Sequence, residues 1–205
     1  MPELRTSLVP SALTRALIDG AVRPRGAVLD LAEPGPQATE PAIIEQNSRL
    51  MVAGDLDVAQ MSFGTFTRAR DLGVPIIGLP IFPGRRFVQP AMAVAADSDL
   101  ETPADLRGKR AGIGQFWQTA FIWHRLVLHT LYGIRQEDIS WTCTAPERWD
   151  ELPSPRAPTR LDRSGRDPVA LLRDGEADVA LVGARWTSPW WEMAQRCSTC
   201  LRPAA

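Results

Sequence analysis

The sequence predicts an α/β fold, in which helices alternate with buried strands. The first observation is a phrase that occurs twice, as Gly54-Asp55-Leu56-Asp57-Val58-Ala59 and as Gly175-Glu176-Ala177-Asp178-Val179-Ala180. Each copy follows a helix-like segment, so the Gly can end the helix, the acidic residue can turn the chain, and the Val/Ala run can enter a buried strand. Ligands of open α/β sheets bind beyond the carboxyl ends of strands, so two such units predict two sides of one cleft. A plainer interpretation is that the phrase is common turn chemistry and indicates only the fold class.

The second observation is the order of elements in the first half of the chain. Strands are expected at 4–9 and 28–31, in the first repeated phrase, and at 75–82 and 91–95; helices are expected at 11–18, 43–53 and 64–72. The run at 75–82 is apolar on both faces, which predicts a strand buried on both sides. The stretch at 34–41 is a loop, because its prolines and glycine fit neither a helix nor a sheet interior.

The same alternation continues in the second half. Thr102 and Pro103 begin a short helix that Gly108 ends, and a strand at 110–113 follows. A helix over 119–131 has an apolar stripe that predicts a core-facing side, made of Ala120, Trp123, Val127 and Leu131. A strand at 139–142, an irregular surface excursion at 146–166 and a helix from Asp167-Pro168 to Arg173 complete the pattern.

Composition limits the classes of function. The chain has 205 residues, with Lys+Arg 23 against Asp+Glu 24 and a net charge of -1, so nothing in the balance indicates nucleic acid or an anionic membrane as a partner. No apolar run approaches the roughly 20 residues that span a bilayer, so we expect no membrane insertion. The first residues carry no basic, apolar and small-residue leader pattern, so we expect a cytoplasmic protein.

Cysteine and histidine predict no metal site. Cys197 and Cys200 form a lone Cys-x-x-Cys beside the C-terminus, where redox and metal motifs are not typical. His124 and His129 lie one residue outside the i,i+4 spacing of a helical metal pair. The Gly112-Ile113-Gly114 run lacks the third glycine of a dinucleotide motif, and the sequence identifies no cofactor and no oligomeric state.

Four blocks, in order, resemble the 4,5-dihydroxyphthalate decarboxylase family. They are Thr14-Arg15-Ala16-Leu17-Ile18-Asp19-Gly20-Ala21-Val22-Arg23-Pro24, Asp57-Val58-Ala59-Gln60-Met61-Ser62, Pro80-Ile81-Phe82-Pro83-Gly84-Arg85-Arg86-Phe87 and Thr102-Pro103-Ala104-Asp105-Leu106-Arg107-Gly108-Lys109-Arg110-Ala111-Gly112. The resemblance continues through the second repeated phrase to about Arg185 and so covers most of the chain. The last block also occurs widely in solute-binding proteins of the periplasmic type.

The resemblance implies a type II periplasmic-binding-protein fold, a two-lobed clamshell with the ligand closed between two α/β lobes. The lobes would be residues 1–93 and 94–185, followed by a Trp-rich tail at 186–205, whose tryptophans we expect to be buried, with an interaction surface as the alternative. In that fold the chain normally returns to the first lobe, and little sequence is left here for the return. Either the chain is a truncated member or the tail replaces part of the missing lobe, and in both cases the first lobe can be incomplete.

The candidate ligand site is a ring of groups that suit a carboxylate. The loop 114–119 joins a strand end to a helix start, where free N–H groups and the helix dipole favour an anion, and Gln115, Gln118 and Thr119 add neutral donors. Arg85 and Arg86 can form a bidentate clamp, with exposed surface side chains as the alternative. Ser62 follows the first repeated strand and Arg185 the second, and both complete the candidate ring.

Departures from the family leave two functions open. The family's acidic and aromatic run after the first strand is Pro10-Ser11-Ala12-Leu13 here, its Arg-His-Ser is Val88-Gln89-Pro90, and its Pro-Glu-Tyr-Gln-Met-Thr loop is 114–119. No candidate acid therefore stands at these three positions, and no catalytic residue is assigned. The first function is a carboxy-lyase of aromatic catabolism that acts on a dihydroxylated aromatic acid. The second is a solute-binding protein or ligand sensor for a small carboxylated compound, and a non-functional remnant is a third interpretation.

Overall fold

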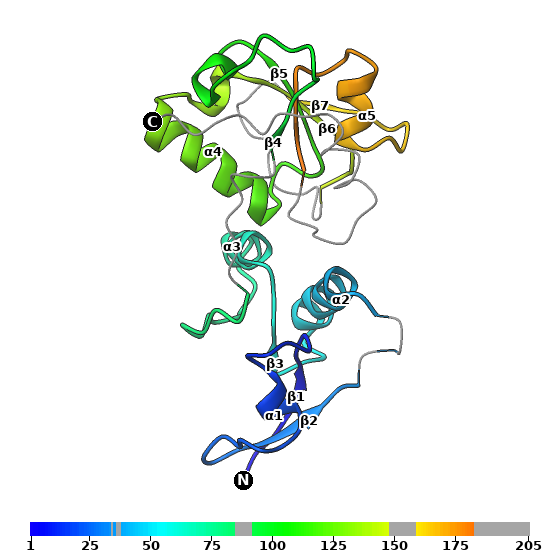
Figure 1. The fold of residues 1–205 in the computed structure, drawn as a ribbon. Helices are drawn as coiled ribbons and strands as arrows, with labels where there is room; N and C mark the ends of the chain where they lie inside the picture. The colour runs from blue at the N-terminus through cyan, green and yellow to red at the C-terminus, as the bar shows by residue number, and fades with distance from the viewer. Residues whose placement is uncertain (34, 36–37, 85–91, 148–158, 183–205) are drawn as a thin grey trace. The chain divides into compact units, whose positions relative to one another are not determined.

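We describe residues 1–33, 35, 38–84, 92–147 and 159–182 of a computed structural model. The chain divides into two compact units, Met1–Arg85 and Arg86–Ala205, which we call unit 1 and unit 2 and describe separately (Figure 1). The limits of 93 and 185 for the two lobes stay predictions, and the Trp-rich tail lies outside the described residues. Within the described part, no helix is long and apolar enough to cross a membrane.

Unit 1 holds a three-stranded parallel sheet in the order β2-β1-β3. Its strands are β1 (Glu3–Ser7), β2 (Val28–Leu31) and β3 (Val58–Ala59), and its helices are α1 (Arg15–Ile18), α2 (Glu40–Ala53) and α3 (Phe63–Asp71). Gly54 ends α2 in the left-handed region, at φ 79°, which only glycine adopts without strain. The predicted role of the glycine in the first repeated phrase is therefore confirmed.

Unit 2 holds a five-stranded mixed sheet in the order β4-β8-β5-β6-β7, in which only β4 is antiparallel. Its strands are β4 (Met92–Ala93), β5 (Arg110–Ile113), β6 (Ser140–Cys143), β7 (Thr159–Leu161) and β8 (Val179–Leu181). Its helices are α4 (Thr119–Tyr132) and α5 (Pro168–Arg173), with short 3-10 turns η2 (Pro103–Leu106) and η3 (Gln136–Asp138). Asp167 caps α5 as predicted, because its carboxylate accepts from the N–H groups of Val169 and Ala170.

The two faces of the unit 2 sheet carry different helices (Figure 1). Ala111, Ile113 and Trp141 face the main core, to which α4 contributes Phe121 and Leu128. The intervening Gly112 faces α5, where a Cβ would lie 3.2 Å from the Pro168 carbonyl oxygen. Glycine is therefore favoured at this position, because an added Cβ would be in tight contact with α5 and the helix would have to shift slightly.

The repeated phrase ties neighbouring strands together in the same way in both units. In unit 1, Arg5 of β1 donates to both carboxylate oxygens of Asp57 and to the Gly54 carbonyl. In unit 2, Arg110 of β5 donates to both oxygens of Asp178 and to the Gly175 carbonyl. The phrase is thus more than common turn chemistry, since its aspartate binds an arginine of the adjacent parallel strand, the third residue of β1 in unit 1 and the first residue of β5 in unit 2.

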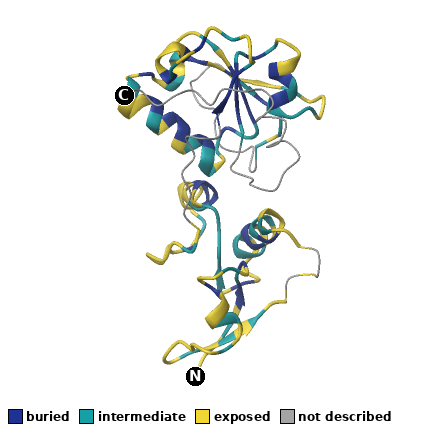
Figure 2. Cartoon of the chain, in the orientation of Figure 1, coloured by how far each residue is buried: buried dark blue, intermediate teal, exposed yellow. Residues whose placement is uncertain are grey.

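The buried strand predicted at 75–82 is wrong. This segment forms neither helix nor strand, and Ile77, Leu79, Ile81 and Phe82 are 83, 57, 68 and 52% exposed (Figure 2). Prolines at 75, 80 and 83 remove backbone donors, and β3, with two residues, pairs only with β1 among the described residues. A run of apolar residues therefore does not by itself predict a buried strand, because burial also requires a neighbouring strand with which to pair.

The stripe predicted for α4 is also wrong. The buried side of α4 consists of Phe121, His124, Arg125 and Leu128, while Trp123 and Leu131 are 46 and 67% exposed. The helix is apolar nearly all round, so hydropathy did not identify its inner face. The packing of the sheet places Phe121 and Leu128 inward, and this brings an arginine into the core.

The stretch 146–166, predicted to be irregular, contains β7, which pairs in parallel with the edge of β6. All three of its residues are exposed, so no apolar pattern marks it.

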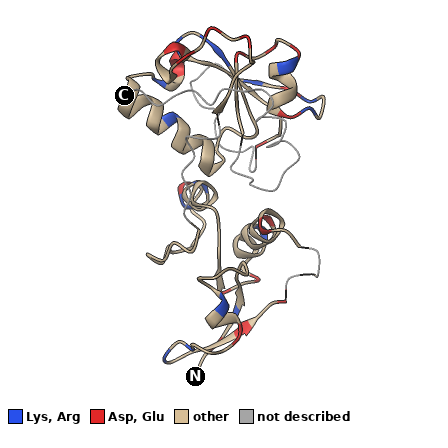
Figure 3. Cartoon of the chain, viewed as in Figure 1, with Lys and Arg blue, Asp and Glu red and all other residues tan. Residues whose placement is uncertain are grey.

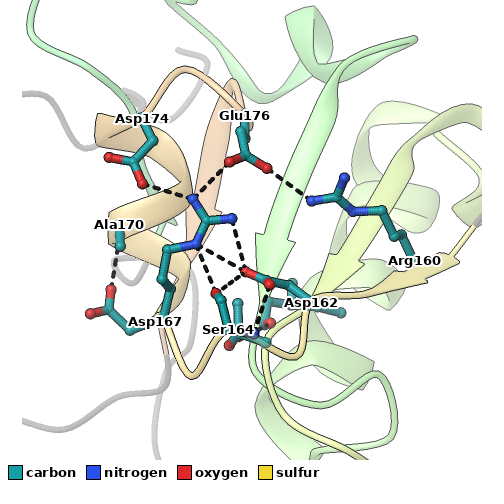
Figure 4. A network of polar contacts seen from close by, with 10 residues as sticks. Arg160, Asp162, Ser164, Asp167, Ala170, Asp174 and Glu176 are labelled. Atoms are coloured by element: carbon teal, nitrogen blue, oxygen red, sulfur yellow. Dashed lines mark hydrogen bonds and ion pairs between the residues drawn. The ribbon is translucent and has the colours of Figure 1, made fainter.

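A charged network connects the end of β7 to α5 and β8 (Figure 4). Arg166 bonds Asp162, Asp174 and Glu176, and Arg160 also bonds Glu176. Each of these acids has a partner, so the network stabilises the fold instead of presenting a free acidic cluster.

Candidate functional site

The loop predicted to bind a carboxylate connects β5 to α4 at the carboxyl edge of the parallel strands of unit 2. The loop after β6 lies against it, since Thr144 N and Ala145 N donate to the Gly114 carbonyl at 3.1 Å each. Gln115 Nε2 donates to the Pro146 carbonyl at 2.6 Å and joins the two loops a second time. The carboxyl ends of β5 and β6 therefore form one connected surface, which is where ligands bind in open α/β sheets.

The backbone of this loop already holds a carboxylate, which Glu147 supplies. Phe116 N donates to Glu147 Oε1, and Trp117 N lies 3.4 and 3.3 Å from Oε1 and Oε2. The two N–H groups precede a helix of 14 residues, whose dipole favours negative charge at this end. The acid that these N–H groups bind belongs to the chain itself and was not expected from the sequence, and the binding of an external anion by this loop stays a prediction.

A buried cation lies beneath the loop. Arg125 of α4 is 8% exposed, and its Cζ atom lies 3.7 Å from the centre of the Phe116 ring and 5.9 Å from that of Trp141. No described group accepts a hydrogen bond from its Nη1. Burial lowers the pKa of Arg125 to about 10, and the negative charge of Glu147 opposes that shift. Arg125 is the single Lys, Arg, Asp or Glu in the sequence of α4, and most of this helix is tan in Figure 3.

A thiol lies in the same core. Cys143, at the end of β6, is buried, and its burial raises the thiol pKa to about 11. Cys143 is therefore a neutral side chain at ordinary pH and not a reactive thiolate. Among the described residues, no group of three or more His, Cys, Asp or Glu is arranged to hold a metal ion.

The other predicted site residues are distributed over the chain. Gln118 is exposed and ends the loop as the N-cap residue of α4, and Thr119 is the first residue of that helix. Ser62, in unit 1, caps α3, since its Oγ accepts from Thr65 N at 3.3 Å and donates to Thr65 Oγ1 at 2.7 Å. The structure thus brings Gln115, Gln118 and Thr119 together on one loop. Arg85, Arg86 and Arg185 lie outside the described residues.

Unit 1 has a polar carboxyl edge of its own. The side chain of Asn47, 1% exposed, donates to the carbonyls of Ser7 and Gln60 at 3.2 and 3.0 Å. Gln60 Oε1 in turn accepts from Val9 N at 3.3 Å. These amides join the ends of β1 and β3 and serve the backbone, so their first role is to hold the edge of the sheet together.

Glu147 and Arg125 were not predicted as site residues, although the sequence contains a signal for each. Glu147 lies four residues after the end of β6, and an acid just beyond a parallel strand end is in the region where sites form. Arg125 shares a helical face with Phe121 and Leu128, at spacings of four and three residues. An arginine within a candidate buried stripe indicates a buried charge that requires a counter-ion.

A hollow of about 690 Å³ in unit 2 lies at the opposite edge of the sheet. It is lined by Lys109, Arg110 and Asp178 together with residues 95–100 and parts of α5. Arg110 and Asp178 bind each other there, so the walls present a completed ion pair. The carboxyl edge, with its backbone donors, is the better candidate for the site.

Comparison with known proteins identifies relatives of this chain. The chain is 32% identical over 178 residues to the 4,5-dihydroxyphthalate decarboxylase of Comamonas testosteroni, an alignment covering 83% of this chain and 52% of the relative. It is 30% identical over 128 residues to the enzyme of the same name from Pseudomonas putida, covering 62% of this chain and 47% of that relative. The chain is a relative of the 4,5-dihydroxyphthalate decarboxylases. The resemblance seen in the four sequence blocks is confirmed.

The relationship to these decarboxylases covers part of their length, since the chain spans about half of each relative that it matches. No family model matches the sequence. Among solved structures, the periplasmic aliphatic sulphonate binding protein SsuA from Escherichia coli matches with a TM-score of 0.53 at 16% identity, over 96% of this chain and 54% of that protein. This likeness confirms the predicted α/β fold of the periplasmic-binding-protein type.

Proposed function

We propose that the chain is a carboxy-lyase of the 4,5-dihydroxyphthalate decarboxylase type, acting on a dihydroxylated aromatic acid in the catabolism of aromatic compounds. The observation that supports it most is the 32% identity to the decarboxylase of Comamonas testosteroni over most of this chain. Because the chain spans about half of that relative, the activity and the substrate are carried over as proposals.

The geometry of unit 2 supports the binding step. Decarboxylation requires that the substrate carboxylate be held, that charge on the ring be stabilised as carbon dioxide leaves, and that a proton reach the vacated carbon. The N–H groups of Phe116 and Trp117 already bind a carboxylate, so the loop 114–119 can hold one. Gln115 and Gln118 are neutral donors on the same loop. Arg85 and Arg86 are proposed to clamp the second carboxylate.

The alternative is a binding protein that holds a small carboxylated compound without converting it. The fold of a sulphonate binding protein favours this function, as does the lack of an acid or histidine in the three segments that depart from the family's pattern. A binding protein needs the anion site but no proton donor. The two functions therefore share the binding of the carboxylate and differ in whether a proton is then delivered to the ligand.

One experiment separates them. The purified protein is incubated with 4,5-dihydroxyphthalate, with and without a divalent metal, while carbon dioxide release is measured and binding is followed by calorimetry. Release supports the carboxy-lyase; binding without release transfers the assignment to a binding protein; neither binding nor release contradicts both. The variants Arg85→Ala and Arg86→Ala, singly and together, should weaken binding, and the exposed Arg173→Ala serves as the matched control.

A further inference from the structure

The contact between Glu147 and the β5–α4 loop has the form of a bound ligand. Its carboxylate accepts from Phe116 N and Trp117 N, the two backbone donors that the proposed function requires for a substrate. Two N–H groups cannot serve two carboxylates at full strength. A ligand carboxylate that binds here must therefore replace that of Glu147.

The buried guanidinium of Arg125 is a second and independent sign of an anion site. Helical side chains lean toward the N-terminus of their helix, so Arg125 reaches back to the start of α4 and lies on the ring of Phe116. Its Nη1, in a side chain only 8% exposed, has no hydrogen-bond acceptor among the described residues. Burying a cation is costly, and the negative charge of Glu147 offsets part of that cost, since it opposes the lowering of the Arg125 pKa by burial.

We propose that Phe116 N, Trp117 N and Arg125 form an anion site that Glu147 fills in the empty protein, and that an external carboxylate binds by displacing Glu147. The site itself depends on the contacts of Glu147 with the two N–H groups and on the buried, unpaired nitrogen of Arg125 against the Phe116 ring, whereas an aromatic acid as the natural competitor rests on the proposed function. Glu147 is then a built-in competitor, so removing it should strengthen the binding of carboxylates.

The direct test replaces Glu147 and offers a small carboxylate. Glu147→Ala should lower the melting temperature, and sodium acetate should restore it more than sodium chloride at the same ionic strength, because acetate occupies the vacated donors. The backbone amide NMR signals of Phe116 and Trp117 should shift at a lower acetate concentration in Glu147→Ala than in the unaltered chain, where acetate must first displace Glu147. The exposed Glu101→Ala is the matched control, for which acetate and chloride should act alike.

Two further measurements complete the test. Phthalate should bind Glu147→Ala at least about tenfold more tightly than the unaltered chain, a factor that corresponds to about 1.4 kcal/mol of removed competition. In the double variant Arg125→Met with Glu147→Ala, the response of the two amides to acetate should be reduced. If Glu147→Ala unfolds, Glu147→Gln keeps the size and hydrogen-bonding oxygen of the side chain and should still bind phthalate more tightly.

The results that would overturn the proposal differ from those that would overturn the proposed function. Unchanged or weaker phthalate binding by a folded Glu147→Gln or Glu147→Ala, with no acetate response of the Phe116 and Trp117 amides, would contradict the anion site. An acetate response without any binding of phthalate or 4,5-dihydroxyphthalate would support the anion site and contradict the aromatic substrate.

Discussion

Arg110 and Asp178 form a two-point ion pair across neighbouring parallel strands, with 2.6 Å from Nη2 to Oδ1 and 3.2 Å from Nε to Oδ2. The backbone N–H of Arg110 donates to the same carboxylate at 2.7 Å. Arg5 and Asp57 repeat the arrangement in unit 1. One sequence phrase thus builds the same strand junction in two units of the chain, where a side-chain fork and a backbone donor fix the register of the adjacent strand.

Replacing the aspartate of this junction should destabilise unit 2. Asp178→Asn keeps the size of the side chain and removes its charge, so the expected loss in the free energy of unfolding is roughly 1 kcal/mol, reduced because the pair is partly exposed. Chemical unfolding followed by circular dichroism measures the loss. The exposed Asp99→Asn, in the same unit, should change stability much less.

The same junction predicts a pH dependence in unit 1. Hydrogen bonds from the Arg5 side chain and backbone lower the pKa of Asp57 to about 2. A carboxyl whose folded pKa is below its unfolded value of about 3.9 stabilises the fold above that value and loses the contribution as the pH falls toward 2. The stability difference between the unaltered chain and Asp57→Asn should therefore be largest near neutral pH and shrink between pH about 4 and about 2. A difference independent of pH would contradict the ionic role of Asp57, as would a carboxyl ¹³C titration with an ordinary midpoint.

Arg125 should contribute to the site more than to stability. Arg125→Met keeps most of the volume and removes a buried charge with an unpaired nitrogen, so the free energy of unfolding should change by less than about 1 kcal/mol or rise. Arg125→Ala leaves a cavity under the Phe116 ring and should cost about 2–4 kcal/mol. Thermal and chemical unfolding of the two variants measure both values. If Arg125→Met and Arg125→Ala lost the same large amount of unfolding free energy, the charge of Arg125 itself would be shown to stabilise the core.

The exposed segment 75–82 provides a test of the corrected fold. Ile77→Thr and Ile81→Thr should change the free energy of unfolding by less than about 0.5 kcal/mol, because both side chains are more than half exposed. Leu128→Ala, at a side chain 1% exposed, should cost about 2–5 kcal/mol. Losses of about 2–5 kcal/mol in the free energy of unfolding at Ile77 or Ile81 would indicate that this segment is buried in the folded protein.

A side chain at Gly112 is expected to destabilise unit 2. An added Cβ would lie 3.2 Å from the Pro168 carbonyl oxygen and 3.3 Å from Leu171 Cδ1, so α5 must shift slightly to admit Gly112→Ala, which should cost about 1–3 kcal/mol. Gly35→Ala, where a Cβ would meet nothing within 4 Å, is the matched control. Denaturant unfolding of the two variants distinguishes a packing effect from a general effect of replacing glycine.

The sequence alone determined the fold class, most of the elements and the relationship to the decarboxylases. Local signals were sufficient where neighbours along the chain decide the structure: Gly54 ends α2, Asp167 caps α5, and the strands at 28–31 and 110–113 have the predicted bounds. These features depend on backbone geometry and hydrogen bonds within a few residues, which a pattern of residue types records.

Only the tertiary structure decided which apolar surfaces are buried and which charges meet. The inner face of α4 and the exposed segment 75–82 depend on what packs against them, and hydropathy contains no information about a distant partner. Glu147 reaches the start of α4 because the loops after β5 and β6 lie side by side, 31 residues apart in the chain for Phe116 and Glu147. The sequence therefore predicted a loop that suits an anion, and the fold supplied both the carboxylate that fills it and the buried arginine beneath it.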